Sequence, residues 1–398
     1  MTKTLEELLA TNQSPFLVAE KGMPATFRAG SIKKDGVLTA ATGAKPSDFE
    51  ATHDNLLRDR GYDPAEWRIT SVTDSEWDVQ TKTGTDTFQA FKFTAVPRGA
   101  AEGEAPNIDD LIAIVNEPRF MAGSAPRYMA ELEAPIGDGA WVHALGDLQL
   151  FKIDGDGVEG TLRRVLASID AGVQQYLAML ARPSHVHVAW LGDCIEGGVS
   201  QGGRNMWRTS GTLTEQVRLL RRIMLYAIDA YAPYCQRLTV VSVPGNHDEA
   251  MRLPVNTRSD DSWAIDALVA ISDAIELNSD KYGHVECYVP GNDEQDVTME
   301  IGGLVTTHIH GHQYRIGKEW DWWKGQAFGG RQAGLAKLLL YGHQHHFSID
   351  SKGDRLRVCV PALESESTWW VHKTGEVGAP GGLVFSIIDG APSGFTVL

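Results

Sequence analysis

The first third of the chain contains apolar and polar positions that alternate with the two-residue period of a β-strand. Phe88–Val96 reads FQAFKFTAV, and Trp67–Thr73 and Trp77–Lys82 are also strand-like. Phe49–Arg60 has the pattern of a helix, which ends at Gly61. The pattern therefore predicts one helix and at least three strands before residue 97.

A segment rich in Pro, Gly, Ala and Glu follows at residues 97–106, and this composition is typical of a linker. A short helix is predicted next, at Ile108–Val115. Residues 1–135 are therefore expected to form a small α+β accessory module. The sequence leaves its role open.

From Gly139 onward, short apolar strands alternate with amphipathic helices. Helices are predicted at residues 160–182, 212–231 and 262–277. Strands are predicted at residues 141–145, 186–191, 238–243, 285–289, 297–301, 304–307, 337–341, 355–360 and 382–388. Alternating strands and helices that pass into a strand-rich tail predict an α/β sandwich over residues 136–398, with helices outside.

The charge distribution limits the partners that the chain could have. The formal net charge is −16, and acidic residues exceed basic ones on both sides of residue 136. Proteins held on nucleic acid by bulk electrostatics normally have a basic face or domain. Any nucleic-acid contact must therefore be local or assisted by a metal ion.

The sequence gives no sign of a membrane or secretory segment. No apolar run approaches the roughly 18 residues of a membrane span, and residues 1–13 lack the apolar core of a signal peptide. The four cysteines are isolated along the chain, which suits a reducing compartment. We therefore expect a cytoplasmic protein without a membrane partner.

Polar residues follow five of the predicted strands directly. These segments are Gly146–Gln149, Gly192–Glu196, Gly245–Glu249, His308–His312 and Gly342–His346. Because ligand sites in open α/β sheets form at the carboxyl ends of strands, the five segments are expected to meet. Their Asp, Asn and His side chains are the ligand types that a pair of divalent ions requires, with one carboxylate shared between the ions.

The motif order D-x-(H/Q)…GD…GNHD…H…GHxH spans residues 147–345, about half of the chain, and resembles the calcineurin-like metallophosphoesterase superfamily. The resemblance implies two packed mixed β-sheets flanked by helices, a four-layer sandwich. It also implies a dinuclear-metal-dependent phosphodiesterase, in which a hydroxide that bridges two metal ions attacks phosphorus.

The same resemblance assigns a role to each motif residue. Asp193 would bridge the two ions. Besides Asp193, the ligands of the first ion would be Asp147, Gln149 and His345. Besides Asp193, the ligands of the second ion would be Asn246, His310 and His343. His247 would donate a proton to the leaving oxygen or clamp the phosphoryl group, and Asp248 would orient its imidazole.

Two of these assignments leave alternatives open. Gln149 stands where the family usually has His; it either ligates the ion or only hydrogen-bonds a metal-bound water. As a ligand, its neutral amide oxygen would favour Mn²⁺ or Mg²⁺ over Zn²⁺. Mn²⁺ is therefore the expected ion, with Mg²⁺, Fe and Zn²⁺ as alternatives. In the fourth motif, His308 and His310 share one face of the strand, and His310 is preferred because it lies nearer the strand end.

Three features could set the choice of substrate. Residues 198–209 form a Gly-rich stretch that carries Arg204 and Arg208. Residues 314–331 combine cations with aromatic rings, among them Arg315, Trp320, Trp322 and Trp323. Such residues can stack bases and pair with phosphates, or they can pack a loop against the core. His312 is expected to support the centre or to contact the substrate.

The leading interpretation is a DNA exonuclease or endonuclease. The segments GDLQLFK and GHQHH resemble phage-encoded SbcD-type nucleases, which would imply host cytoplasm, a homodimer and an SbcC-like ATPase partner. One alternative is a phosphatase or phosphodiesterase acting on a small nucleotide or a phosphoprotein. Another is a non-catalytic scaffold with the same fold.

Overall fold

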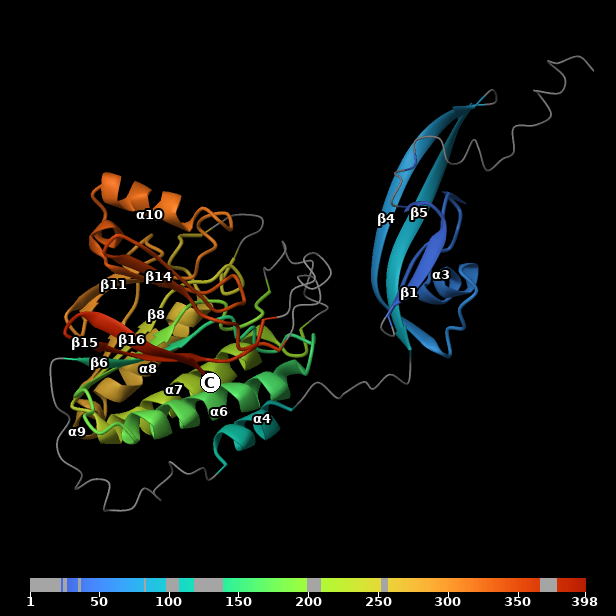
Figure 1. Ribbon diagram of the computed structural model, residues 1–398. Helices are drawn as coiled ribbons and strands as arrows, with labels where there is room; N and C mark the ends of the chain where they lie inside the picture. The colour runs from blue at the N-terminus through green and yellow to red at the C-terminus, as the bar shows by residue number, and fades with distance from the viewer. Residues whose placement is uncertain are drawn as a thin grey trace, which may run out of the picture. The chain divides into compact units, whose positions relative to one another are not determined.

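The computed structural model describes residues 23, 27–34, 37–81, 84–97, 107–117, 139–198, 209–251, 257–365 and 378–398. The chain divides into two compact units, Met1–Glu104 and Ala105–Leu398 (Figure 1). Each unit has strands and helices of its own, so the two are described separately.

In its described residues, the first unit is an antiparallel sheet with one helix. Its elements are β1 (Gly30–Lys34), β2 (Val37–Ala41), β3 (Lys45–Pro46), α3 (His53–Asp59), β4 (Trp67–Thr81) and β5 (Gly84–Pro97). The strand order is β1-β2-β5-β3, and β4 pairs with β5 in a long hairpin. Leu56 and Leu57 of α3 pack against Trp67 and Phe93 of this sheet.

Two predicted strands of this unit are a single strand in the structure. The polar segment Asp74-Ser75-Glu76, which separated them in the sequence, pairs with Ala90 and its neighbours on β5. Backbone pairing therefore continues through residues whose side chains do not alternate between apolar and polar. A register shift occurs instead between Ile69 and Ser71.

The second unit contains two sheets. The six-stranded sheet has the order β16-β15-β6-β7-β8-β9 and the five-stranded sheet the order β10-β11-β12-β14-β13. The strands are β6 (Ala140–Leu145), β7 (His185–Trp190), β8 (Arg237–Ser242), β9 (Val285–Tyr288), β10 (Val297–Ile301), β11 (Leu304–Ile309), β12 (Leu338–Tyr341), β13 (Ser348–Lys352), β14 (Arg355–Cys359), β15 (Leu383–Ile388) and β16 (Ala391–Val397). Strands β6 to β9 are parallel, as are β11, β12 and β14.

Where the structure describes this unit, its helices are α4 (Ile108–Val115), α6 (Gly157–Leu177), α7 (Leu213–Tyr231), η4 (Ala232–Tyr234), α8 (Trp263–Glu276), α9 (Ser279–Tyr282), α10 (Glu319–Phe328) and η5 (Gln332–Leu335). Helix α4 packs against α6 and α7, although the sequence analysis grouped it with the first module. Helix α10 falls in the Trp-rich segment, for which the sequence analysis named no element.

The described residues of the second unit form three apolar cores. One lies between the six-stranded sheet and α6, α7 and α8, where residues such as Leu162, Ile223 and Trp190 are fully buried. A second lies between the two sheets, and a third lies between α10 and the five-stranded sheet. Figure 1 shows the order of these layers in space, from α6 and α7, through the sheets, to α10. The fold is therefore mixed α/β, with helices outside two sheets.

None of the helices in the described ranges has the length and apolar character needed to cross a membrane.

Helix α7 begins with a capping box, in which the Thr212 side chain accepts a hydrogen bond from the backbone N–H of Glu215. Thr212→Ala is expected to lower the free energy of unfolding by about 1 kcal/mol, because it leaves that N–H without its partner. Urea denaturation monitored by circular dichroism would measure the loss. Thr212→Ser keeps the hydroxyl and should be nearly neutral; an equal loss there would contradict the capping role.

Candidate metal centre

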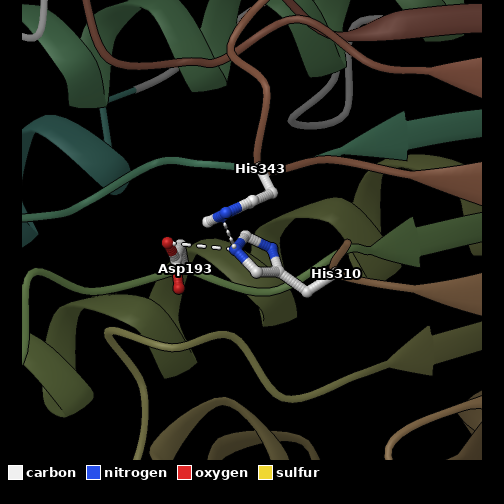
Figure 2. A group of neighbouring side chains, drawn as sticks. All are labelled: Asp193, His310 and His343. Atoms are coloured by element: carbon white, nitrogen blue, oxygen red, sulfur yellow. Dashed lines mark hydrogen bonds and ion pairs between the residues drawn. The ribbon is translucent and has the colours of Figure 1, made fainter. Parts of the chain in front are cut away.

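The five polar segments lie at the carboxyl ends of β6, β7, β8, β11 and β12, where the two sheets meet across their shared core. Figure 2 shows three of their side chains, Asp193, His310 and His343, converging from separate strand ends. The possible ligand atoms of these three lie within 4.8 Å of one another. The strand-end argument thus predicted the meeting of these residues.

His310 is the middle member of this trio. Its Nε2 lies 3.1 Å from Asp193 Oδ2 and 3.1 Å from His343 Nδ1. Two ligands about 2.1 Å from one octahedral ion are separated by about 3 Å, so the spacing suits a common cation. His310 Nδ1 lies 2.7 Å from the Leu191 carbonyl and donates to it, which leaves Nε2 facing Asp193.

Asp147 and His345 form a second, adjacent side of the centre. His345 Nε2 lies 3.2 Å from Asp147 Oδ1, and His310 Nε2 lies 4.0 Å from the same oxygen. The backbone N–H of His343 donates to Asp147 Oδ2 at 2.8 Å. The two sides are therefore connected through Asp147 and His310.

Asn246 provides an independent test of whether a cation fits. Its Oδ1 is buried and, within the described residues, has no hydrogen-bond partner. The next residue, His247, donates its backbone N–H to Asp193 Oδ1 at 2.8 Å, which ties the Asn246 loop to the centre. A buried acceptor without a donor is unfavourable, and a bound cation would satisfy it. The residues present therefore fit a metal ion.

Five of the seven expected ligands have a backbone conformation that is uncommon outside glycine. Asp147, Gln149, Asp193, His343 and His345 have φ of 52°, 41°, 50°, 68° and 55°. A left-handed residue of this kind costs about 1 kcal/mol or more. Such strain persists only where the surroundings impose it, and it concentrates at functional sites.

The buried charges of the centre do not balance. Among the described residues of the centre, five carboxylates, those of Asp147, Asp193, Glu196, Asp248 and Glu364, are at most 5% exposed, and one buried ammonium, that of Lys152, accompanies them. Buried charges are normally paired or coordinate metals. With all five carboxylates ionised, four negative charges are therefore left for cations to compensate.

The pKa values of the histidines respond to this excess. Burial disfavours the His310 imidazolium, but the carboxylates of Asp193 and Asp147 outweigh burial and raise its pKa to about 9. Asp147 and Glu364 similarly outweigh burial and raise the pKa of His345 to about 10. Burial and the neighbouring His310 instead lower the pKa of His343 to about 4. A divalent ion would take the place of protons at His310 and His345.

His247 lies beside the centre, but it is not oriented by Asp248 as the resemblance implied. Its Nδ1 lies 3.2 Å from Glu196 Oε2, and its Nε2 lies 3.9 Å from Asp193 Oδ2. Despite burial, Asp193 and Glu196 raise the pKa of His247 to about 9. Glu196, which the sequence analysis did not select, is therefore the carboxylate that orients this imidazole.

Asp248 has a different task. Its carboxylate accepts backbone N–H bonds from Gly245, Cys194 and Ile195 at 3.1 to 3.2 Å. These bonds join the loop after β7 to the loop after β8. The prediction that Asp248 orients His247 is wrong, because its oxygens are occupied by the backbone.

The Gln149 amide oxygen is also engaged. It accepts a hydrogen bond of 2.6 Å from Lys152 Nζ, and the same ammonium pairs with Glu364. Glu364 Oε1 in turn lies 2.8 Å from His345 Nδ1. Lys152 and Glu364 were missed in the sequence, although Glu364 lies just beyond the end of β14 and so obeys the strand-end rule.

His308 lies away from the centre. Its Nε2 is 3.0 Å from His187 Nε2, and its Nδ1 is 3.0 Å from the Val297 carbonyl. Of the two candidates in the fourth motif, His310 is the one that contacts Asp193.

The expected substrate residues do not all lie at the centre. Arg204 and Arg208 lie outside the described residues. The His312 ring lies 5.4 Å from that of His310, centroid to centroid, and so borders the centre. Arg315 is exposed.

The tryptophans of α10 pack against the five-stranded sheet. Trp323 is buried and its Nε1–H donates to the Ala333 carbonyl. Trp320 stacks on Trp323, and Trp322 packs on Tyr314. Because Trp323 is buried, it cannot stack on a substrate base, and for this residue the alternative of packing against the core holds.

No protein-family model and no curated protein matches the chain. Solved structures that resemble it include a predicted phosphoesterase from Streptococcus pneumoniae TIGR4 (12% identity, TM-score 0.29, 65% of this chain and 90% of that one). They also include an archaeal phosphodiesterase (12%, 0.30, 65% and 99%) and Vps29 from Entamoeba histolytica complexed with Zn²⁺ (12%, 0.29, 65% and 98%). These scores are too low to carry an argument about function, which depends instead on the geometry of the centre.

Gly245 is required where the β8 loop passes Asp193, because a Cβ there would lie 2.1 Å from Asp193 Oδ1. Gly245→Ala is expected to displace that carboxylate and weaken Mn²⁺ binding on the order of tenfold or more. Isothermal titration calorimetry would measure the affinity. Gly325→Ala, in open space on α10, is the matched control. Mn²⁺ affinity equal to wild type in Gly245→Ala would contradict the placement of Asp193 in the centre.

Proposed function

We propose that this chain is a metal-dependent phosphoesterase that hydrolyses phosphodiesters with two divalent ions. The observation that carries the proposal is the convergence of Asp193, His310 and His343, with Asp147 and His345 adjacent. Carboxylate and imidazole ligands around one shared carboxylate suit a two-metal hydrolase. The proposed ligands are Asp147, Asp193, Asn246, His310, His343 and His345, within the metallophosphoesterase fold that the motifs imply.

The chain's own residues would prepare the reaction in three ways. The bound ions would supply Lewis-acid polarisation of the phosphoryl group and activation of water. Asp193, as the expected bridging ligand, would fix the separation of the two ions. His247, whose Nδ1 is engaged by Glu196, presents Nε2 beside the centre, where it can donate a proton to the leaving oxygen.

The charge balance favours divalent cations and an anionic substrate. The positive charge of two divalent ions, Lys152 and a protonated His247 would exceed the negative charge of the five buried carboxylates, so net positive charge would face the phosphate. Asn246 and the carboxylates supply hard oxygen ligands, which supports Mn²⁺ or Mg²⁺, with Zn²⁺ and Fe as alternatives.

DNA remains the proposed substrate to test first, and the homodimer, the SbcC-like ATPase partner and the location in host cytoplasm remain predictions. One observation favours the alternative of a small nucleotide ester. A cavity of about 200 Å³ borders the centre at Gly245 and His312, and Glu249, Arg258 and Asp261 also line it. Its size suits a small leaving group, and its two acids disfavour a polyanion.

His343→Ala is expected to abolish Mn²⁺-dependent hydrolysis of bis-p-nitrophenyl phosphate, because it removes a proposed ligand. The assay would run beside end-labelled linear single- and double-stranded DNA, with a chelator control. The matched control is His53→Ala, an exposed histidine of α3. Near-full activity in His343→Ala would contradict the proposed function. Cleavage of the small diester without cleavage of DNA would favour the small nucleotide ester.

His247→Ala is expected to lose 10²- to 10⁴-fold in rate, because it removes proton donation. Its Mn²⁺ affinity should stay close to that of wild type, since His247 is not a proposed ligand. Rate measurements and calorimetry on the same preparation would separate the two effects. Normal turnover would remove His247 from the mechanism.

A further inference from the structure

Lys152 is a buried cation within a metal centre that needs cations. The Lys152 side chain is only 9% exposed, and its ammonium contacts Gln149 Oε1 and Glu364 Oε2. Burying an ammonium is unfavourable unless it is paired and hydrogen-bonded. Gln149 and Glu364 provide both kinds of contact, so the position of this charge is well defined.

The contacts of Lys152 lead directly to the Asp147–His345 side of the centre. Glu364 pairs with Lys152 through one oxygen, and its other oxygen lies 2.8 Å from His345 Nδ1. His345 Nε2 then lies 3.2 Å from Asp147. Ammonium, carboxylate, imidazole and carboxylate thus follow one another in an unbroken line of polar contacts.

The backbone fixes this line at both ends. The N–H of Glu364 donates to the Asp147 carbonyl at 3.1 Å, and the N–H of Lys152 donates to the Gln149 carbonyl at 3.0 Å. Arg164 Nη1 donates to the Leu363 carbonyl at 2.6 Å. Glu364 is therefore held beside Asp147 whether or not an ion is bound.

We propose that Lys152 is a resident cation that keeps the Asp147–His345 side a weak site for a divalent ion. Its ammonium occupies oxygens of Gln149 and Glu364 that an ion on this side would otherwise draw upon, and its charge opposes a second cation. Gln149 is on this account a partner of Lys152 rather than a metal ligand. The inference rests on the metal centre of the proposed function.

The contacts of the two sides differ in the way that this role requires. The Asp193–His310–His343 side offers three converging ligand atoms and the buried Asn246 oxygen, and none of these accepts a bond from a lysine among the described residues. On the Asp147–His345 side, the carboxylate of Glu364 lies between the Lys152 ammonium and the His345 imidazole and contacts both. One ion should therefore bind tightly at the Asp193–His310–His343 side. Occupancy of the Asp147–His345 side by the second ion should rise and fall with the concentration of free metal.

Counting bound Mn²⁺ by electron paramagnetic resonance tests this directly. Metal-free wild type should bind one ion tightly and a second at least tenfold more weakly. Lys152→Met removes the charge and releases the oxygens of Gln149 and Glu364, so the second ion should tighten at least tenfold. Lys152→Arg keeps the charge and should keep the second ion weak. Lys281→Met, a lysine paired with Asp229 on the surface, is the matched control and should change neither ion.

Each other outcome has a defined meaning. Two ions of equal affinity in wild type, or a second ion that is unchanged or weaker in Lys152→Met, would overturn the role of Lys152. If wild type binds no Mn²⁺, the proposed function itself fails, and this result is distinguishable from the others. If circular dichroism shows that Lys152→Met does not fold, Glu364→Gln replaces it. That variant leaves the ammonium uncompensated and should weaken the second ion at least tenfold; an unchanged second ion would overturn the proposal.

Discussion

The constraint on which the rest of the structure depends is negative charge buried between two sheets. Five carboxylates lie out of solvent, those of Asp147, Asp193, Glu196, Asp248 and Glu364, and in the described part of the chain only Lys152 supplies a buried ammonium. Such an arrangement is strongly unfavourable unless further cations enter. Protonated histidines supply that charge in the metal-free chain, and divalent ions would supply it in the loaded one. The pKa values of His310 and His345 are raised because the neighbouring carboxylates stabilise their protonated forms.

The stability of the fold offsets the unfavourable free energy of burying these charges. Three extensive apolar cores stabilise the second unit, and their cooperative packing holds loops in conformations that they would not adopt alone. Parallel strands bring their carboxyl ends to one edge, and left-handed residues such as Asp193 and His343 then turn the chain back over that edge. Asp248 joins two of the loops through backbone N–H groups, so the ligands form one rigid set.

The sequence was most informative where chemistry and strand ends coincide. Asp147, Asp193, His310, His343 and His345 each follow an apolar strand, and periodicity alone located those strands. Which carboxylate orients which histidine could not be read in this way. The resemblance implied Asp248 for His247, but Glu196, which lies on another loop, contacts that imidazole. Lys152 and Glu364 belong to residue types that are usually exposed, and only the contact between two distant loops buries them. The Trp-rich segment offered two interpretations, and the packing of Trp323 decided for the core.

A crystal structure of the protein soaked with Mn²⁺, with anomalous diffraction recorded at the manganese edge, would locate the bound ions. We expect a strong anomalous peak within bonding distance of Asp193, His310 and His343, and a weaker peak beside Asp147 and His345. The weaker peak should grow with the Mn²⁺ concentration of the soak. A map without anomalous density among these side chains, at Mn²⁺ concentrations that saturate binding in solution, would contradict the account.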